Sequence, residues 1–275
     1  RGLGDVYKRQ ISDKIPMEEA LLHEYEINLT QANTTPCMVS PLKEILGPCA
    51  TGQGSQDLLL GKVQSIDGVS KATMEVLKYV ALKENTKLHS VPTPILRSEC
   101  QSGWKKAKER TSSAMKHGTH FGHWKAGHLD DTIADIHTSL ANIPYLTGYS
   151  PERWQHGVNT LIPKEAGNFR VGRLRTILLY EADFNFNNKI LGMRMMQEAE
   201  KNEILAREQY GSRKKKTAIE CALNNRLTFD ILRQIKIPAG ICSCDLKSCY
   251  DRIVHAFASL AMQRTWAPVA AVESM

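Results

Sequence analysis

The sequence lacks long apolar runs, and this absence narrows the classes of protein to consider. No stretch of 18 or more apolar residues occurs among the 275 residues, so no transmembrane helix and no membrane partner are expected. Internal repeats and low-complexity tracts are also missing, which excludes repeat architectures. No secretory signal is seen, and the seven cysteines are an odd number. We therefore expect reduced thiols in an intracellular protein, nuclear or cytoplasmic.

The spacings of common metal and phosphoryl-transfer sites are absent as well. Asp245-Leu246-Lys247 does not fit the D-x-D pattern of doubly acidic phosphatases. One segment is rich in histidine, with His117, His120, His123 and His128. Its spacing is compatible with zinc, yet no cysteine or carboxylate completes the usual paired pattern. The run from Cys242 to Cys249 is a weaker metal-binding candidate than the histidine segment.

The composition indicates a packed protein with a polyanionic partner. Hydrophobic residues make up 42% of the chain, enough for a buried core. Lys and Arg number 36 against 29 Asp and Glu, which gives a net charge of +7. A basic balance favours nucleic acid as a partner without fixing the fold.

The chain divides into three parts. Residues 1–10 (RGLGDVYKRQ) resemble translated sequencing-adapter read-through and are left out of the fold prediction. Residues 11–115 are expected to be helical and have no assigned role. Residues 116–275 form the third part, which is expected to contain strands as well as helices. Its last residues carry no helix-capping or turn signal. We expect an α+β fragment, mostly helical at its N-terminal end.

Hydrophobic periodicity and turn residues place the elements. Helices are predicted over 16–27, 40–46, 70–85, 98–115, 127–140, 186–210, 217–235 and 250–263. Ile133, Ile136 and Leu140 share one face of the fifth of these, and five Ile and Leu residues share a face of the seventh. Strand-like runs at 157–162 and 174–180 flank a turn with Gly and Arg, which predicts a hairpin. A further short strand is predicted to end at Asp245.

Two basic segments are candidate phosphate-binding sites. The predicted hairpin carries Lys164, Arg170, Arg173 and Arg175 against Glu165 alone. Arginine engages phosphate oxygens in pairs, so a basic hairpin is suited to hold a triphosphate, although a solubilising turn is an equal interpretation. The second segment is Arg213, Lys214, Lys215 and Lys216. It is a candidate nucleic-acid contact or a solvated charge run.

Four segments, in order, resemble the fingers and first palm segment of reverse transcriptases, most closely those of non-LTR (LINE-like) retroelements. They are GYSPERWQHGVNTLIPK, NFRVGRLRTILLYEADFNFNNKIL, EQYGSRKKKTAIECAL and CDLKSCYDRIVH. THFGHWKAG, upstream, resembles the same subfamily. Thr176, Ser212 and Cys249 depart from the usual residues without removing a charge. The resemblance covers about residues 145–264, and the motifs that follow in the family are not in this chain.

The resemblance implies an RNA-directed DNA polymerase with a right-hand fingers and palm fold, of which this chain holds a truncated part. Asp245 is then one carboxylate ligand of the catalytic Mg²⁺ pair, held at a strand end. Tyr250 excludes the ribose 2′-hydroxyl, while Arg175 and Lys164 neutralise the triphosphate. Asp251 matches the second acid of the motif and supports the turn. An RNA template, a DNA primer and dNTPs are the implied partners, and the chain alone is expected to be inactive.

Two alternatives stay open at this point. One is a non-catalytic, basic, helical nucleic-acid-binding module, which needs no acid at a strand end. The other is a metal-binding domain built on the histidine cluster. Group II intron and telomerase-like enzymes share the palm motif, so the polymerase subfamily is also open.

Overall fold

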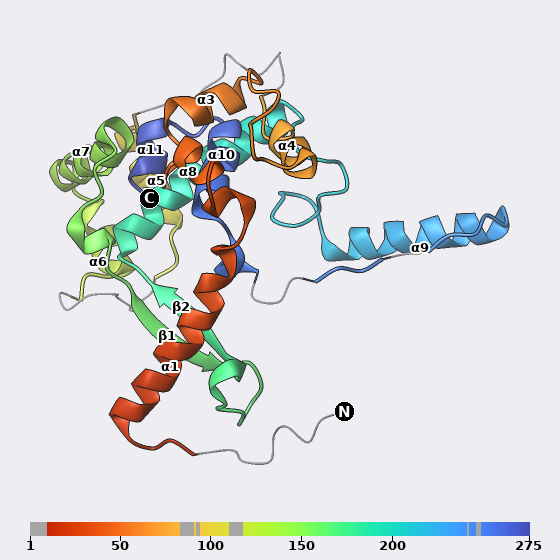
Figure 1. Cartoon of the computed structure of the whole chain (residues 1–275). Helices are drawn as coiled ribbons and strands as arrows, with labels where there is room; N and C mark the ends of the chain where they lie inside the picture. Colours follow the sequence, from red (N-terminus) through yellow and green to blue (C-terminus); the bar gives the residue numbers. More distant parts are fainter. Residues whose placement is uncertain (1–9, 83–90, 92–93, 110–117, 241, 246–248) are drawn as a thin grey trace.

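The computed structural model describes residues 10–82, 91, 94–109, 118–240, 242–245 and 249–275, and within them the protein is mostly helical with a small antiparallel sheet (Figure 1). This content agrees with the α+β class expected from the sequence. The principal elements are α1 (Lys14–Leu29), α2 (Leu42–Leu46), α3 (Gln53–Leu59), α4 (Lys71–Lys78), α5 (Arg97–Lys106), α6 (Phe121–Gly127), α7 (Asp131–Thr147), β1 (Val158–Pro163), β2 (Leu174–Leu179), α8 (Ala182–Lys201), α9 (Ala218–Gln234), α10 (His255–Arg264) and α11 (Val269–Glu273). None of these helices has the length and apolarity that a bilayer-spanning segment requires.

Two hydrophobic clusters form the body of the molecule. The first core gathers side chains from α5, α7, α8 and α11 around Trp104, which is fully buried and stacks on Phe186 with ring centroids 4.1 Å apart. The second core joins α2, α3, α4 and α10 through Leu42, Leu77 and Leu260. Burial of large apolar side chains is the main stabilising term in such clusters.

The C-terminal helices connect the two cores. Leu260 of α10 belongs to the second core, whereas Val272 of α11 belongs to the first. Between them, Gln263 donates to the carbonyl of Ala50 at 2.7 Å and accepts from Gln56 at 2.8 Å. A buried amide satisfied on both sides fixes this join, because an unpaired amide there would lose its hydration without compensation.

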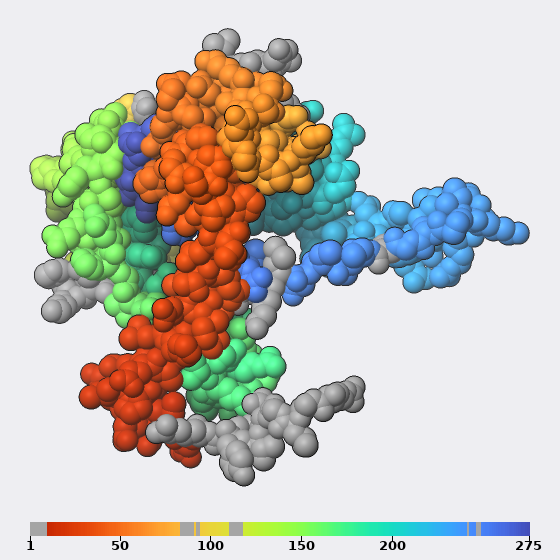
Figure 2. Space-filling model, in the orientation of Figure 1, coloured from red at the N-terminus to blue at the C-terminus, as the bar shows by residue number. Residues whose placement is uncertain are grey.

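The hairpin prediction is confirmed. β1 and β2 pair antiparallel, with Ile162 opposite Arg175 and Val158 opposite Leu179. The helix α1 crosses this hairpin (Figures 1 and 2), and the hydroxyl of Thr176 donates to that of Tyr25 at 3.1 Å. Only one face of the two-stranded sheet is contacted in this way.

The helix α9 projects from the body as an arm (Figures 1 and 2). Its start is defined by a capping box, in which Thr217 and Glu220 satisfy each other's backbone N–H groups. No residue of α9 is buried, and the apolar face predicted from the sequence is exposed. The exposed members of that face are Ile219, Leu223, Leu227, Ile231 and Ile235.

The strand predicted to end at Asp245 is wrong for the residues described. Residues 237–240 and 242–245 have no regular secondary structure and are exposed. A strand needs a neighbouring edge for its backbone N–H and C=O groups. The described part of the chain offers none beside this segment, since its one sheet contains only β1 and β2.

Four predicted helices have different limits. The helix predicted over 70–85 ends at Lys78, and the helix predicted over 127–140 begins at Asp131 and extends to Thr147. The helix predicted over 186–210 begins at Ala182 and ends at Lys201, after which Glu203 adopts a positive φ of 50°. The helix predicted over 250–263 is interrupted, with a 3₁₀ turn, η6 (Tyr250–Arg252), followed by extended residues before α10. The C-terminal part of the predicted helix 98–115 lies outside the described residues.

Candidate functional site

The predicted catalytic residues lie at the surface. Asp245 is exposed in an irregular segment, and Tyr250 is 88% exposed in η6. Among the described residues, no hydrogen bond or ion pair joins Asp245 to Tyr250, Arg175 or Lys164. Residues 246–248, which follow Asp245, lie outside the described part. The structure therefore leaves these side chains accessible without assembling them into one site.

The hairpin presents its predicted cations on an accessible face. Side chains alternate along a strand, so Arg175 points away from the face on which Thr176 contacts α1. Ile162 lies opposite Arg175, and Lys164 is two residues beyond Ile162, with its N–H bonded to the carbonyl of Arg173 at 3.0 Å. Alternation thus places Lys164 with Arg175 on the face that α1 does not cover. Both side chains are exposed.

A bulky apolar side chain accompanies these cations at the hairpin tip. Phe169 lies in the loop that connects β1 to β2, and its side chain is 74% exposed. Arg170 is exposed beside it, while Arg173 is 3.9 Å from Glu165 in a solvent-exposed ion pair. Exposed aromatic and cationic groups together are typical of surfaces that stack on bases and contact phosphates.

The second basic segment divides into one engaged residue and three exposed ones. Arg213 contacts both carboxylate oxygens of Glu200, at 2.8 and 2.6 Å, and donates to the carbonyls of Ala206 and Gln209. Hydrogen bonding from Arg213 lowers the pKa of Glu200. Arg213 therefore holds the loop after α8, and contacting a phosphate would require breaking these bonds. Lys214, Lys215 and Lys216 are exposed.

Of the described histidines in this segment, His120 and His123 lie together, with ring centroids 3.9 Å apart, and His128 belongs to a different group. His120 accepts from the N–H of Gly122 at 3.1 Å, and His123 accepts from the N–H of His120 at 3.2 Å. These two side chains cap the N-terminus of α6 and compensate its unpaired N–H groups. His117 lies outside the described residues. In the second candidate, the run from Cys242 to Cys249, the sulfur atoms of Cys242 and Cys244 lie 3.6 Å apart in an exposed segment without regular secondary structure.

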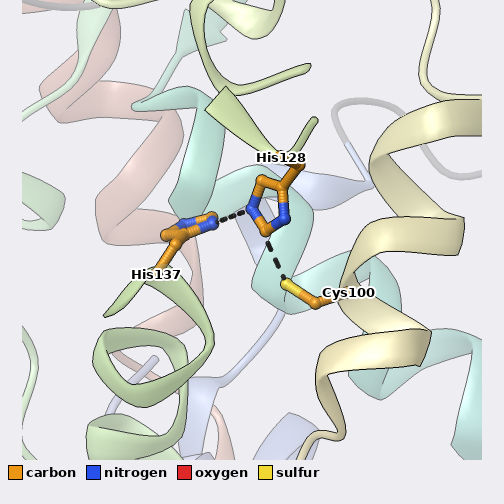
Figure 3. A group of neighbouring side chains, drawn as sticks. All are labelled: Cys100, His128 and His137. Carbon is orange, nitrogen blue, oxygen red and sulfur yellow. Dashed lines mark hydrogen bonds between the residues drawn. The ribbon is translucent and has the colours of Figure 1, made fainter. Parts of the chain in front are cut away.

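His128 instead meets Cys100 and His137 in the first core (Figure 3). Their ligand atoms all lie within 4.8 Å of one another, and within the described ranges this is the one group of three or more His, Cys, Asp or Glu side chains that converges so closely. Cys100 Sγ is 4.0 Å from His128 Nε2, and that nitrogen is hydrogen bonded to His137 Nδ1. The three residues come from α5, the C-terminal cap of α6, and α7.

Aromatic rings enclose this Cys-His-His cluster. The ring of Trp124 stacks on His137 at 4.1 Å, and Trp104 stacks on His128 at 5.8 Å. The exposed fractions are 0% for Cys100, 5% for His128 and 3% for His137. Surroundings this apolar disfavour charge.

The same burial shifts the acid–base properties of all three groups. Burial raises the pKa of the Cys100 thiol to about 11, although contacts with Thr138 and Trp104 oppose the shift. Burial lowers the pKa of His128. It also lowers that of His137 to about 4, helped by the charge of His128 and opposed by Asp183. Both imidazoles are therefore neutral near pH 7, with a lone pair on one nitrogen of each.

Sequence reasoning missed two members of this cluster. His128 was a candidate, but the eight residues between it and His137 fall outside the familiar ligand spacings, and Cys100 precedes it by 28 positions. The only local signal was the position of His137 among small residues on one face of α7. Comparisons with protein-family models, curated proteins and solved structures found no match to this chain.

Proposed function

We propose that this chain is part of an RNA-directed DNA polymerase, in which the β1–β2 hairpin holds phosphate groups of the substrates. The observation that carries the proposal is the hairpin, which places Lys164 and Arg175 on the face that α1 leaves uncovered. It lies within the segments that resemble the fingers of non-LTR reverse transcriptases. The observed hairpin supports the proposal, and the resemblance supplies the reaction.

The described residues do not by themselves form a two-Mg²⁺ site. Asp245 is exposed, and within the described ranges it belongs to no converging group of three or more His, Cys, Asp or Glu side chains. In nucleotidyl transfer two such ions bridge the attacking and leaving oxygens. The contribution we assign to this chain is therefore substrate binding together with one metal-ligating carboxylate, Asp245. The hairpin cations contact phosphates, and Tyr250 discriminates the sugar by its bulk.

Binding measurements with the whole chain test the hairpin. The probe is a fluorescent RNA template annealed to a DNA primer, titrated over a range of salt concentrations. The double variant Lys164→Gln and Arg175→Gln is expected to weaken binding and to lower the slope of log K against log salt by about two. Lys71→Gln, an exposed residue of α4, is the matched control and is expected to bind as the unaltered chain does. Equal binding by the double variant would remove the hairpin from the interface.

Incorporation assays separate the polymerase from a binding module. The assay uses a polymerase that contains these residues and extends a primer. In it, Tyr250→Ala is expected to increase ribonucleotide incorporation, whereas Tyr250→Phe is expected to change it little, because the side chain acts by its volume. Asp245→Asn is expected to abolish extension. Unchanged sugar selectivity in the Ala variant would eliminate the gate role of Tyr250.

A second candidate is a non-catalytic nucleic-acid-binding module. The exposed positions of Lys214, Lys215 and Lys216 at the base of the α9 arm favour it, as does the absence of a described strand before Asp245. Such a module would bind the same primer–template but would show no dependence on Asp245 in any assay.

A further inference from the structure

We propose that Cys100, His128 and His137 form a structural zinc-binding site that joins α5, α6 and α7. This inference is independent of the proposed polymerase function, because the site lies in the first core and includes none of the predicted catalytic or substrate-binding residues. Its ligand set is one sulfur and two imidazole nitrogens.

The donor atoms favour zinc over the other common divalent ions. Thiolate and imidazole are soft to borderline ligands, which suit Zn²⁺, whereas Mg²⁺ and Ca²⁺ prefer oxygen. Zinc sites with three protein ligands are well known, with a fourth position left for a small ligand. Within the described ranges, no additional His, Cys, Asp or Glu joins the three, so the fourth position is open to a small ligand such as water.

The geometry is close to what zinc requires. Bonds of about 2.0 Å to nitrogen and about 2.3 Å to sulfur place the ligand atoms of a tetrahedral ion about 3.3 to 3.7 Å apart. Cys100 Sγ and His128 Nε2, at 4.0 Å, need only a small approach. His128 Nε2 and His137 Nδ1, now hydrogen bonded, need to separate by rotation of the rings so that both lone pairs reach the ion. All three side chains point toward one another (Figure 3).

An independent observation concerns the other nitrogen of His128. Its Nδ1 is buried and has no hydrogen-bond partner in the described part of the chain. A buried polar atom without a partner is unfavourable, and the hydrogen bond between the two imidazoles uses the other nitrogen of His128. An ion bound by either nitrogen of His128 would add a favourable term to this buried cluster, since structural zinc contributes directly to the free energy of folding.

The position of the cluster explains what the ion would do. The ligands belong to α5, to the C-terminal cap of α6 and to α7. A single ion would fix these helices relative to one another beneath Trp104 and Trp124. The three ligand residues are almost completely buried, so the role we assign to the ion is to hold these elements together.

Metal analysis of the whole chain, purified with a reductant and without chelator, is the first test. We expect about one zinc per chain by elemental analysis. Replacement by Co²⁺ is expected to give a thiolate-to-cobalt charge-transfer band and intense visible bands of a tetrahedral site. Removal of zinc by a chelator is expected to lower the Tm by several degrees. A chain that binds neither zinc nor Co²⁺ through sulfur would overturn the proposal.

Variants assign the ion to these residues. Cys100→Ser is expected to lose the thiolate band, and His137→Gln to lose most of the bound zinc. Cys37→Ser and the double variant His120→Gln with His123→Gln are matched controls, and we expect them to retain one zinc per chain. Zinc retained by Cys100→Ser and lost by the histidine double variant would place the metal at the α6 cap and refute the assignment.

A measurement on the unaltered chain covers the case in which the core variants do not fold. Cys100 is expected to resist alkylation with zinc bound and to react faster after chelation, when the first core opens more often. The exposed Cys242 is the internal control and is expected to react equally fast in both states. A reaction rate of Cys100 that does not change on chelation contradicts the proposal.

Discussion

The helices α4, in the body of the molecule, and α9, in the arm, both begin at a capping residue, but only α4 buries its apolar face. The helix α4 begins with Ser70, which accepts from the N–H of Thr73, and it buries Met74 and Leu77 in the second core. The helix α9 begins with a more complete cap at Thr217 and buries nothing. Capping and periodicity therefore determine where a helix begins, while burial depends on what lies next to it.

The hairpin is intermediate between these two regions. The backbone groups that face each other in β1 and β2 are paired, yet most of the side chains of the hairpin are exposed. Most of the buried apolar side chains belong to the two cores. Substitutions are therefore expected to divide sharply: those in the cores change global stability, and those in the hairpin and arm change binding.

The largest expected difference is between Trp104→Ala and Leu227→Ala. Trp104 is fully buried and contacts five aromatic or imidazole rings, so its loss is expected to cost about 3–5 kcal/mol in the free energy of unfolding. Leu227 is 49% exposed on α9, and its loss is expected to cost less than about 0.5 kcal/mol. Urea titration followed by circular dichroism measures both. Similar costs would mean that the arm packs against the body in solution.

A smaller difference is expected between two glycines in neighbouring helices. A Cβ added at Gly103 of α5 would lie 2.6 Å from Cζ of Phe186, so Gly103→Ala is expected to cost about 1–3 kcal/mol by overpacking. A Cβ at Gly192 of α8 meets no atom within 4 Å. Gly192→Ala is therefore expected to stabilise the protein by up to about 1 kcal/mol, through helix propensity. Thermal unfolding of the two variants should shift in opposite directions, and a shared direction would contradict the packing of α5 on α8.

The two helix caps provide a third comparison. Removing either hydroxyl, in Ser70→Ala or Thr217→Ala, weakens its own helix by about 1 kcal/mol. Because α4 packs in the second core, the loss at Ser70 is expected to appear in the global free energy of unfolding. The loss at Thr217 is expected to appear only as faster amide exchange within α9. Global destabilisation by Thr217→Ala would show that α9 takes part in the cooperative unit.

The smallest expected effect concerns the lysines before α9. Replacing Lys214, Lys215 and Lys216 with Ala is expected to leave stability unchanged and to flatten the slope of log K against log salt for binding of single-stranded RNA, by about two. Arg213 is kept in this variant, because it holds the loop through Glu200. An unchanged slope would identify the three lysines as a solvated charge run.

Several features were predictable because they depend on neighbours in sequence. Two strand-like runs around a turn predict the hairpin. The start of β2 is as predicted, and each of the other three strand ends differs from the prediction by one residue. The capped start of α9 follows from Thr217 and Glu220 in the same way. Accessible cations on the hairpin were predicted for the same reason, since alternation along a strand is a local property.

Other features required the tertiary structure. On α7 the sequence shows Ile133, Ile136 and Leu140 on one face, yet these side chains are 47%, 58% and 49% exposed. The buried face carries smaller or polar residues, among them Ala134, His137 and Ala141. The small side chains on this face allow α5 to pack closely against α7. This packing brings His137 next to Cys100 and His128.

The sequence alone therefore determined the local elements, the basic character of the hairpin and the reverse-transcriptase resemblance. Tertiary structure decided which helix faces are buried, left the segment before Asp245 without a described strand partner, and assembled the Cys-His-His cluster from α5, α6 and α7. The physical reason is the range of the interactions. Caps, turns and alternation act over two to four residues, whereas strand pairing, core packing and metal ligation join residues that are far apart in the chain.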